Sequence, residues 1–233
     1  MIPIGDSLRA RTFPYVNIAI IIACFLVFLY EVAFESNIDR LFFDWAVVPA
    51  ELTEYLGNPG DHPLRVLFTP ITAMFLHGGW FHIMGNMIFL WVFGDNVEDA
   101  LGHLRYLAFY LLCGIAATAA QVWIDPNSPV PMLGASGAIA GVLGAYLVLY
   151  PRATIAALIM PFFFWTAYVP AFVLIGFWFL IQVFNGVASI GYAVGASEGV
   201  AWWAHVGGFL AGFLLLWFFR PRRPSARIGR SMW

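Results

Sequence analysis

The chain has 233 residues, of which 62% are hydrophobic and only 10% are charged, and its formal net charge at pH 7 is -2. Soluble domains contain roughly 45–50% apolar and roughly 25% charged residues, so this composition excludes an ordinary water-soluble domain. The small net charge gives no indication of a nucleic-acid partner. The sequence therefore predicts a protein that lies mainly in the lipid bilayer.

Six apolar stretches have about the length of a membrane-spanning helix. A helix needs about 20 apolar residues to cross the hydrocarbon core, and the candidate spans are residues 15–34, 80–97, 104–124, 134–150, 169–184 and 200–219. The predicted fold class is all-α: a polytopic bundle of six transmembrane helices that forms one membrane domain over residues 15–219. Residues 1–14 precede this domain, and an arginine-rich tail, residues 220–233, follows it.

The distribution of arginine predicts how this bundle is oriented. Basic residues in short flanking loops mark the cytoplasmic face of a membrane protein. Six spans with cytoplasmic termini place most of the arginines on that face: Arg9, Arg11, Arg105, Arg152, Arg220, Arg222, Arg223, Arg227 and Arg230. Only Arg40 and Arg65 fall on the other side. A seventh span would move the tail outside, so the pattern favours six.

Three connections are distinctive. The long first loop, residues 35–79, mixes aromatic and aliphatic residues with acids, so we expect an amphipathic helix in the headgroup region; a plain solvated loop is the alternative. Residues 154–165 are apolar but contain Pro161, and we expect them to form an interfacial connection. Residues 185–199 are rich in small residues and are expected to form a mobile lid, or a flexible loop without a gating role.

Polar side chains within membrane spans are costly and are candidates for a functional site. His82 and Asn86 are four residues apart in the string HGGWFHIMGNM, so they share one face of a helix. Both carry N–H groups, and two donors directed at one point suit an oxyanion. The alternative for this pair is hydrogen bonding that only joins helices.

Ser136 stands near the start of the fourth span, in the string GASGAIAG. The backbone N–H groups at a helix N-terminus are unpaired and attract anions, so the Ser136 N–H is a third candidate donor. A helix over residues 134–150 is about 25 Å long, less than the roughly 30 Å of the hydrocarbon core. If the Arg152 end is anchored at one surface, Ser136 lies below the other. A serine that bonds only its own backbone is the alternative.

His205, in the string AHVGGFLAG, lies about 8 Å into the sixth span, a depth similar to that of Ser136. Small residues spaced four apart on both helices allow close approach: Gly137 and Gly141 in the fourth span, and Ala204, Gly208 and Gly212 in the sixth. We count no acidic residue in the outer half of any span. The sequence therefore predicts a Ser-His dyad without a third member, with a structural histidine as the alternative.

The three strings together resemble the motifs of the rhomboid intramembrane proteases, and they fall in the same spans and order. The resemblance extends from about Phe75 to Phe213 and includes the run GDNVE that ends at Glu98. It implies that Ser136 is the nucleophile and His205 the general base. It also implies an oxyanion hole, which His82, Asn86 and the Ser136 N–H would line.

The same resemblance assigns supporting roles and shows two departures. His77 would hold the first loop in place, and the packing residues would be Gly137, Ala204, Gly208 and Gly212. Some relatives carry a Trp-Arg pair in the first loop, which this sequence lacks. Some also carry an aromatic residue four positions after the serine, where this chain has Ala140.

The function implied is that of an intramembrane serine endopeptidase, which hydrolyses peptide bonds in or near the transmembrane segments of membrane-protein substrates without a metal or cofactor. The compact core and the start of the chain, which has no signal-peptide layout, favour a multi-pass protein of a prokaryotic cell membrane. Two other classes are alternatives. One is a non-catalytic rhomboid-like protein that binds membrane segments, and the other is a small channel or transporter with paired charges at mid-bilayer.

Overall fold

The computed structural model of the protein describes residues 1–61, 63–159, 165–190 and 200–219. Most of the expected lid, residues 191–199, and the arginine-rich tail, residues 220–233, lie outside the described residues. The described part is mostly helical, which confirms the predicted fold class.

Four helices of the described ranges are long and apolar enough to cross a membrane alone: α1 (Tyr15–Ala33), α6 (His103–Ile124), α8 (Ala171–Ser189) and α9 (Trp202–Phe219). A fifth candidate is the bent pair of Leu64–Phe75 and α5 (Trp80–Leu101), with 78° between its two parts. The remaining expected span, residues 134–150, corresponds to α7 (Ser136–Leu149), whose 14 residues reach only about 21 Å. The count of six spans therefore stays a prediction.

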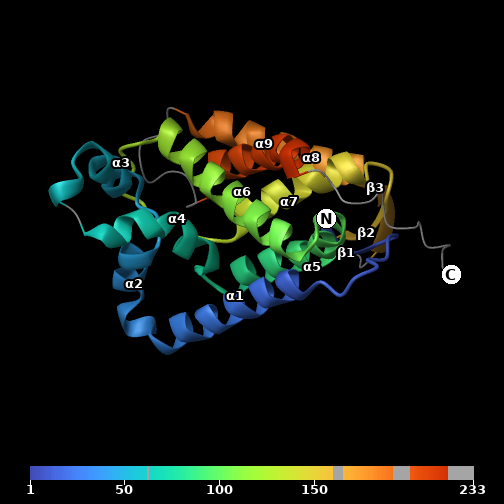
Figure 1. The fold of residues 1–233 in the computed structure, drawn as a ribbon, viewed down its shortest axis with the longest axis horizontal. Helices are drawn as coiled ribbons and strands as arrows, with labels where there is room; N and C mark the ends of the chain where they lie inside the picture. The colour runs from blue at the N-terminus through green and yellow to red at the C-terminus, as the bar shows by residue number, and fades with distance from the viewer. Residues whose placement is uncertain (62, 160–164, 191–199, 220–233) are drawn as a thin grey trace.

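The short helix α7 lies at the centre of the bundle. It packs against α5, α6 and α9, and residues 137–146 of α7 are all buried. The outer helices pack around this centre, with α1 against α5 and α8 against α9. Figure 1 shows the long helices side by side along the horizontal axis of the view. Most of α7 is thus enclosed by protein.

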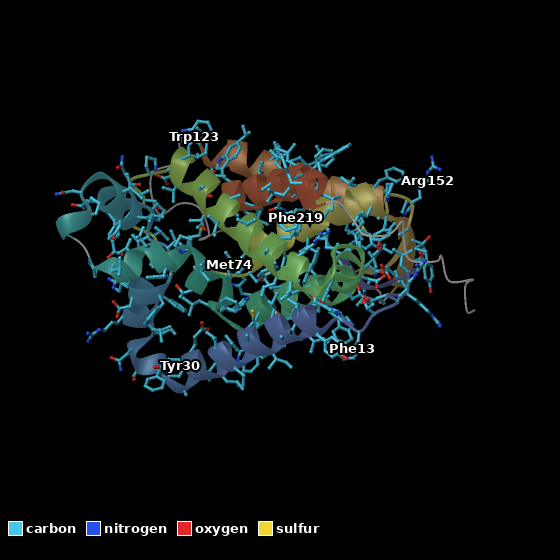
Figure 2. All side chains as sticks on the ribbon, in the orientation of Figure 1. Phe13, Tyr30, Met74, Trp123, Arg152 and Phe219 are labelled. Atoms are coloured by element: carbon cyan, nitrogen blue, oxygen red, sulfur yellow. The ribbon has the colours of Figure 1, made fainter. Side chains whose placement is uncertain are left out.

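The two ends of the bundle differ in structure. At the left of Figure 1, which we call the loop face, lie α2 (Ile38–Trp45), α3 (Pro49–Gly57) and α4 (Thr69–Thr72). Short 3-10 turns flank these helices: Glu35–Asn37 before α2, Pro59–Asp61 and Leu64–Phe68 between α3 and α4, and Ala73–Phe75 after α4. At the right, the sheet face, lies a small β-sheet. Figure 2 labels Tyr30 and Trp123 near the loop face and Phe13 and Arg152 near the sheet face.

The sheet is a feature that the sequence analysis did not predict. Strands β1 (Ile2–Asp6), β2 (Thr154–Ile159) and β3 (Trp165–Pro170) pair antiparallel in the order β1-β2-β3. We expected an interfacial connection over residues 154–165 and only a flanking segment at the N-terminus. The strands form because Ile155 and Ala157 are fully buried against the bundle, while the first residues of the chain supply the partner for their backbone groups.

Asp6 ties this sheet to the helices. Its carboxylate accepts hydrogen bonds from the backbone N of Leu8 and from Asn96 Nδ2, each 3.1 Å away, and from the Tyr146 hydroxyl. Burial raises the pKa of Asp6 to about 6, although the bonds from Tyr146 and Leu8 act in the opposite direction. The N-terminal strand therefore depends on a carboxyl group that holds its proton more tightly than usual.

The protonation of Asp6 predicts a pH dependence of stability. Because the pKa is raised from its ordinary value of 3.8 to about 6 in the folded protein, the contribution of this proton is complete below pH 3.8 and is lost as the pH rises through 6. We expect the melting temperature in detergent to fall over this interval. Asp6→Asn should remove that part of the fall while Asp95, the neighbouring carboxyl, stays in both proteins. An equal fall in melting temperature in the wild type and in Asp6→Asn would contradict this account.

Glu98, on α5, joins the start of α1 to the start of α6. Its fully buried carboxylate accepts hydrogen bonds from the backbone N of Val16 at 3.0 Å and of Asn17 at 2.7 Å. His103 Nδ1 lies 2.5 Å from the same carboxylate. A negative group at a helix N-terminus satisfies unpaired N–H groups and complements the helix dipole, which explains why an acid ends the GDNVE run.

Glycines bring α7 and α9 into backbone contact. A Cβ at Gly208 would overlap the Gly137 carbonyl, and one at Gly212 would overlap the Gly141 carbonyl. Gly137 and Gly141 in turn face Ala117 and Cys113 on α6. The separation of α7 and α9 is therefore set by backbone atoms, which allows little variation in the relative position of side chains on the two helices.

This contact predicts a difference between two alanine substitutions. Gly212→Ala forces α7 and α9 apart, and we expect it to lower the free energy of unfolding by about 1–3 kcal/mol. Gly176→Ala on α8 is the matched control, since a Cβ there has no neighbour within 4 Å, and it should be neutral or slightly stabilising. Thermal unfolding in one detergent measures both. Equal melting temperatures for the two variants would show that the contact does not limit stability.

Candidate active site

The segment before α7 is held inside the bundle by the first loop. Val47 and Met132 exchange backbone hydrogen bonds of 3.0 and 2.7 Å, and Gly134 N donates to Ala73 O at 2.8 Å. Non-helical backbone at membrane depth is tolerated only where protein or a water-filled cavity surrounds it. These bonds satisfy the segment and fix where α7 begins.

Arg65 holds the first loop itself together. Its guanidinium donates to the backbone O of Asp44 at 2.8 Å, in the last turn of α2, and to Glu51 Oε1 on α3 at 3.1 Å. The sequence lacks the Trp-Arg pair of some rhomboids, and in this chain Arg65 joins the two short helices. This use also explains why one arginine lies on the side of the membrane that is otherwise poor in them.

Ser136 and His205 meet where α7 and α9 begin. Ser136 is the first residue of α7, and its Oγ lies 2.8 Å from His205 Nε2. His205 is in the first turn of α9, next to Ala204, whose backbone N donates to Gln121 Oε1 at 3.2 Å. The structure therefore brings the two residues that the sequence analysis paired into direct hydrogen-bond contact.

The imidazole of His205 has partners that the sequence analysis missed. Its Nδ1 lies 2.8 Å from Gln182 Oε1, on α8. Trp178 on α8 and Trp202 on α9 place their rings 5.9 and 6.2 Å from the imidazole ring, centroid to centroid. Aromatic contact with the histidine thus comes from these tryptophans rather than from Ala140, which is fully buried. A polar residue inside the fifth expected span was the signal for Gln182.

His82 lies beside Ser136 with a defined tautomer. Gly78 N donates to His82 Nδ1 at 3.3 Å, so Nδ1 is an acceptor and Nε2 carries the hydrogen. Gly134, whose φ is +120°, allows this approach, because a Cβ there would lie 2.7 Å from His82 Nε2 and 3.7 Å from Ser136 Oγ. The His82 Nε2–H group is therefore a hydrogen-bond donor close to the serine.

The Asn86 side chain is not directed at Ser136 as His82 is. Its Nδ2 donates to the backbone O of His82 at 2.9 Å, one turn earlier on α5, and the side chain is buried. It does not line the cavity that holds Ser136 and His205. Its part in an oxyanion hole stays a prediction.

His77 and Glu31 connect the first loop to α1. The backbone N of His77 donates to Glu31 Oε1 at 3.0 Å, and the ring of His77 packs edge-on against His82 at 5.2 Å. Glu31 corrects our count of acids, because it is a buried carboxylate at the loop-face end of α1. Since it accepts a backbone N–H of the first loop rather than a hydrogen of His205, it does not complete a triad.

Ser136, His205 and His82 line a cavity of about 390 Å³. Apolar side chains, including Met74 and Met132, form much of its remaining wall. Among the described residues, no group of three or more His, Cys, Asp or Glu side chains is placed to hold a metal ion. The polar side chains that line this cavity include the Ser136 hydroxyl, the imidazoles of His205 and His82, and Thr118. A hydroxyl beside an imidazole, with N–H donors nearby, is the arrangement that nucleophilic acyl chemistry uses.

The fold and this constellation define a polytopic helical membrane protein with a serine and a histidine paired in an internal cavity. The family model of the rhomboid domain matches residues 65–222, more than half of the chain. The chain therefore belongs to the rhomboid family.

Several curated proteins are similar over part of their length. RHOMBOID-like protein 5 of Arabidopsis thaliana is 34% identical over 145 residues, which cover 62% of this chain and 41% of that protein. Rhomboid protein 1, mitochondrial, of Saccharomyces cerevisiae is 31% identical over 154 residues, 64% of this chain and 40% of that protein. The human presenilin-associated rhomboid-like protein, mitochondrial, is 32% identical over 116 residues, 48% of this chain and 30% of that protein. The match thus spans less than half the length of these relatives.

These relatives contradict the expected location. They are proteins of a plant, a yeast and a mammal, and two of the three are named as mitochondrial. The expectation of a prokaryotic cell membrane with cytoplasmic termini is therefore wrong. It relied on the compact core and on the start of the chain, neither of which distinguishes between kinds of cell.

Proposed function

We propose that the protein is an intramembrane serine endopeptidase that hydrolyses peptide bonds in or near transmembrane segments of other membrane proteins. The observation that carries this proposal is the 2.8 Å contact between Ser136 Oγ and His205 Nε2 inside a cavity of the helical bundle. A hydroxyl is a weak nucleophile unless an adjacent base takes its proton. Membership of the rhomboid family supports the same class of reaction.

In the proposed reaction, His205 Nε2 takes the proton of Ser136 Oγ as the oxygen attacks a substrate carbonyl. The resulting oxyanion would accept hydrogen bonds from His82 Nε2–H and from the Ser136 backbone N–H at the start of α7. His205 then gives its proton to the leaving amine, which leaves an acyl-enzyme. A water molecule activated by the same histidine completes the hydrolysis.

We also propose that residues 15–219 form one membrane domain with six membrane-embedded segments, flanked by residues 1–14 and 220–233. An even number of membrane-embedded segments is supported by the positions of the start of α1 and the end of α9. Glu98 binds the start of α1, and Arg105, at the start of α6, donates to Phe219 O at the end of α9 at 3.4 Å. Both ends therefore lie at the sheet face, beside the loop between α5 and α6.

The dyad predicts the loss of cleavage when either member is removed. We expect Ser136→Ala and His205→Ala to lower the cleavage rate of a reporter membrane protein in liposomes by at least about 10³-fold. Ser189→Ala is the matched control, because among the described residues the Ser189 hydroxyl donates to Gly186 O on its own helix, and it should cleave at the wild-type rate. Equal cleavage by the wild type and the two dyad variants would refute the proposal and leave a non-catalytic rhomboid-like protein.

The position of His82 predicts an effect of Gly134. A Cβ at Gly134 would crowd His82 Nε2 and strain a backbone with φ of +120°, so Gly134→Ala should displace the proposed oxyanion donor. We expect kcat to fall about 10²-fold, the usual effect of losing one such donor. Gly85→Ala, on the same helix as His82 but with open space around its Cβ, should keep the wild-type kcat. Measured kcat values that agree for the two variants would argue against His82 as a donor.

A further inference from the structure

Gln182 is placed against the side of His205 that faces away from Ser136. The amide lies on α8 and is buried, and its Oε1 is 2.8 Å from His205 Nδ1. The other ring nitrogen, Nε2, is 2.8 Å from Ser136 Oγ. Gln182, His205 and Ser136 thus form an unbroken row of hydrogen-bonded side chains from α8 through α9 to α7.

The orientation of the Gln182 amide follows from its second contact. Its Nε2 lies 3.2 Å from the backbone O of Trp178, one turn earlier on α8. Only the amide NH2 can donate to that carbonyl. The opposite assignment would place the amide oxygen against the carbonyl oxygen and leave both without a hydrogen. The hydrogen-bond network therefore assigns the amide oxygen to the imidazole.

An amide oxygen beside Nδ1 determines the tautomer of the neutral imidazole. Because the oxygen only accepts, Nδ1 must carry the ring hydrogen, and Nε2 must carry the lone pair. The lone pair then faces the Ser136 hydroxyl, as a general base requires. In the opposite tautomer Nε2 would hold a hydrogen and could not take a proton from Ser136.

We propose that Gln182 is a positioning residue that holds His205 in the Nδ1–H tautomer with Nε2 directed at Ser136. This inference rests on the proposed function. Gln182 has the orienting role that a carboxylate has in a Ser-His-Asp triad, but it is neutral. A neutral acceptor suits a helix within the membrane, where a charged side chain is costly. Trp178 and Trp202 add ring contacts, so the imidazole is confined on several sides.

The kinetic test compares three variants on the reporter substrate in liposomes. Gln182→Met keeps the length of the side chain and removes the strong acceptor, so kcat should fall about 10- to 100-fold with KM within about twofold of wild type. Gln182→Glu restores an acceptor oxygen and should recover kcat to within about tenfold of wild type. Gln121→Met is the matched control. It removes an amide that binds the α9 backbone at Ala204 without touching the imidazole, and kcat should change less than about threefold.

A spectroscopic test is independent of activity. In protein with isotope-labelled histidine, the ring 15N and 13C chemical shifts distinguish the two neutral tautomers, and the signals that His205→Ala removes belong to His205. We expect the Nδ1–H form in wild type and in Gln121→Met, and we expect the Nε2–H form to appear in Gln182→Met. Melting temperatures of the variants show whether each one is folded.

The inference would be overturned by a wild-type kcat for Gln182→Met, or by the Nε2–H tautomer of His205 in the wild-type protein. A fall in kcat for Gln121→Met equal to that for Gln182→Met would also refute it, since a general loosening of α9 would then explain both. If wild type and Ser136→Ala cleave alike, the proposed function fails, and the spectrum alone decides whether Gln182 sets the tautomer.

Discussion

The structure depends on the backbone contact between α7 and α9. Gly208 and Gly212 place α9 directly against the carbonyls of Gly137 and Gly141, so no side chain separates the two helices. Two residues on such helices can form a short hydrogen bond only if the helix separation is fixed, because a shift of about 1 Å already impairs a catalytic geometry. The 2.8 Å contact between Ser136 and His205 is a consequence of this packing.

Buried hydrogen-bond acceptors hold in place the helix ends, the first loop and the imidazole, which the glycine contacts between α7 and α9 do not reach. Glu98 binds N–H groups at the start of α1, Glu31 binds an N–H of the first loop, and Gln182 binds the imidazole of His205. Each is a polar side chain in an apolar bundle, where an unpaired group would be costly. Together they hold both ends of the bundle around a central helix that is too short to reach both surfaces.

Much of the fold could be predicted from the sequence, because apolar length and small-residue spacing are local signals. They located the helices to within a few residues and put Ser136 and His205 on neighbouring spans. The sheet could not be predicted in this way, since Ile2 pairs with Leu158 and no local pattern links them. The role of Gln182 depends on which face of α8 meets α9, and the side-chain direction of Asn86 depends on a backbone carbonyl of its own helix. Neither follows from sequence spacing.

The central claim is that His205 makes Ser136 a nucleophile. The most direct measurement is to treat the protein in liposomes with a serine-directed fluorophosphonate and to locate the adduct by mass spectrometry of peptides. The account predicts an adduct on Ser136 in the wild-type protein and none at the same dose in His205→Ala. An adduct spread over other serines, or equal labelling of Ser136 with and without His205, would contradict it.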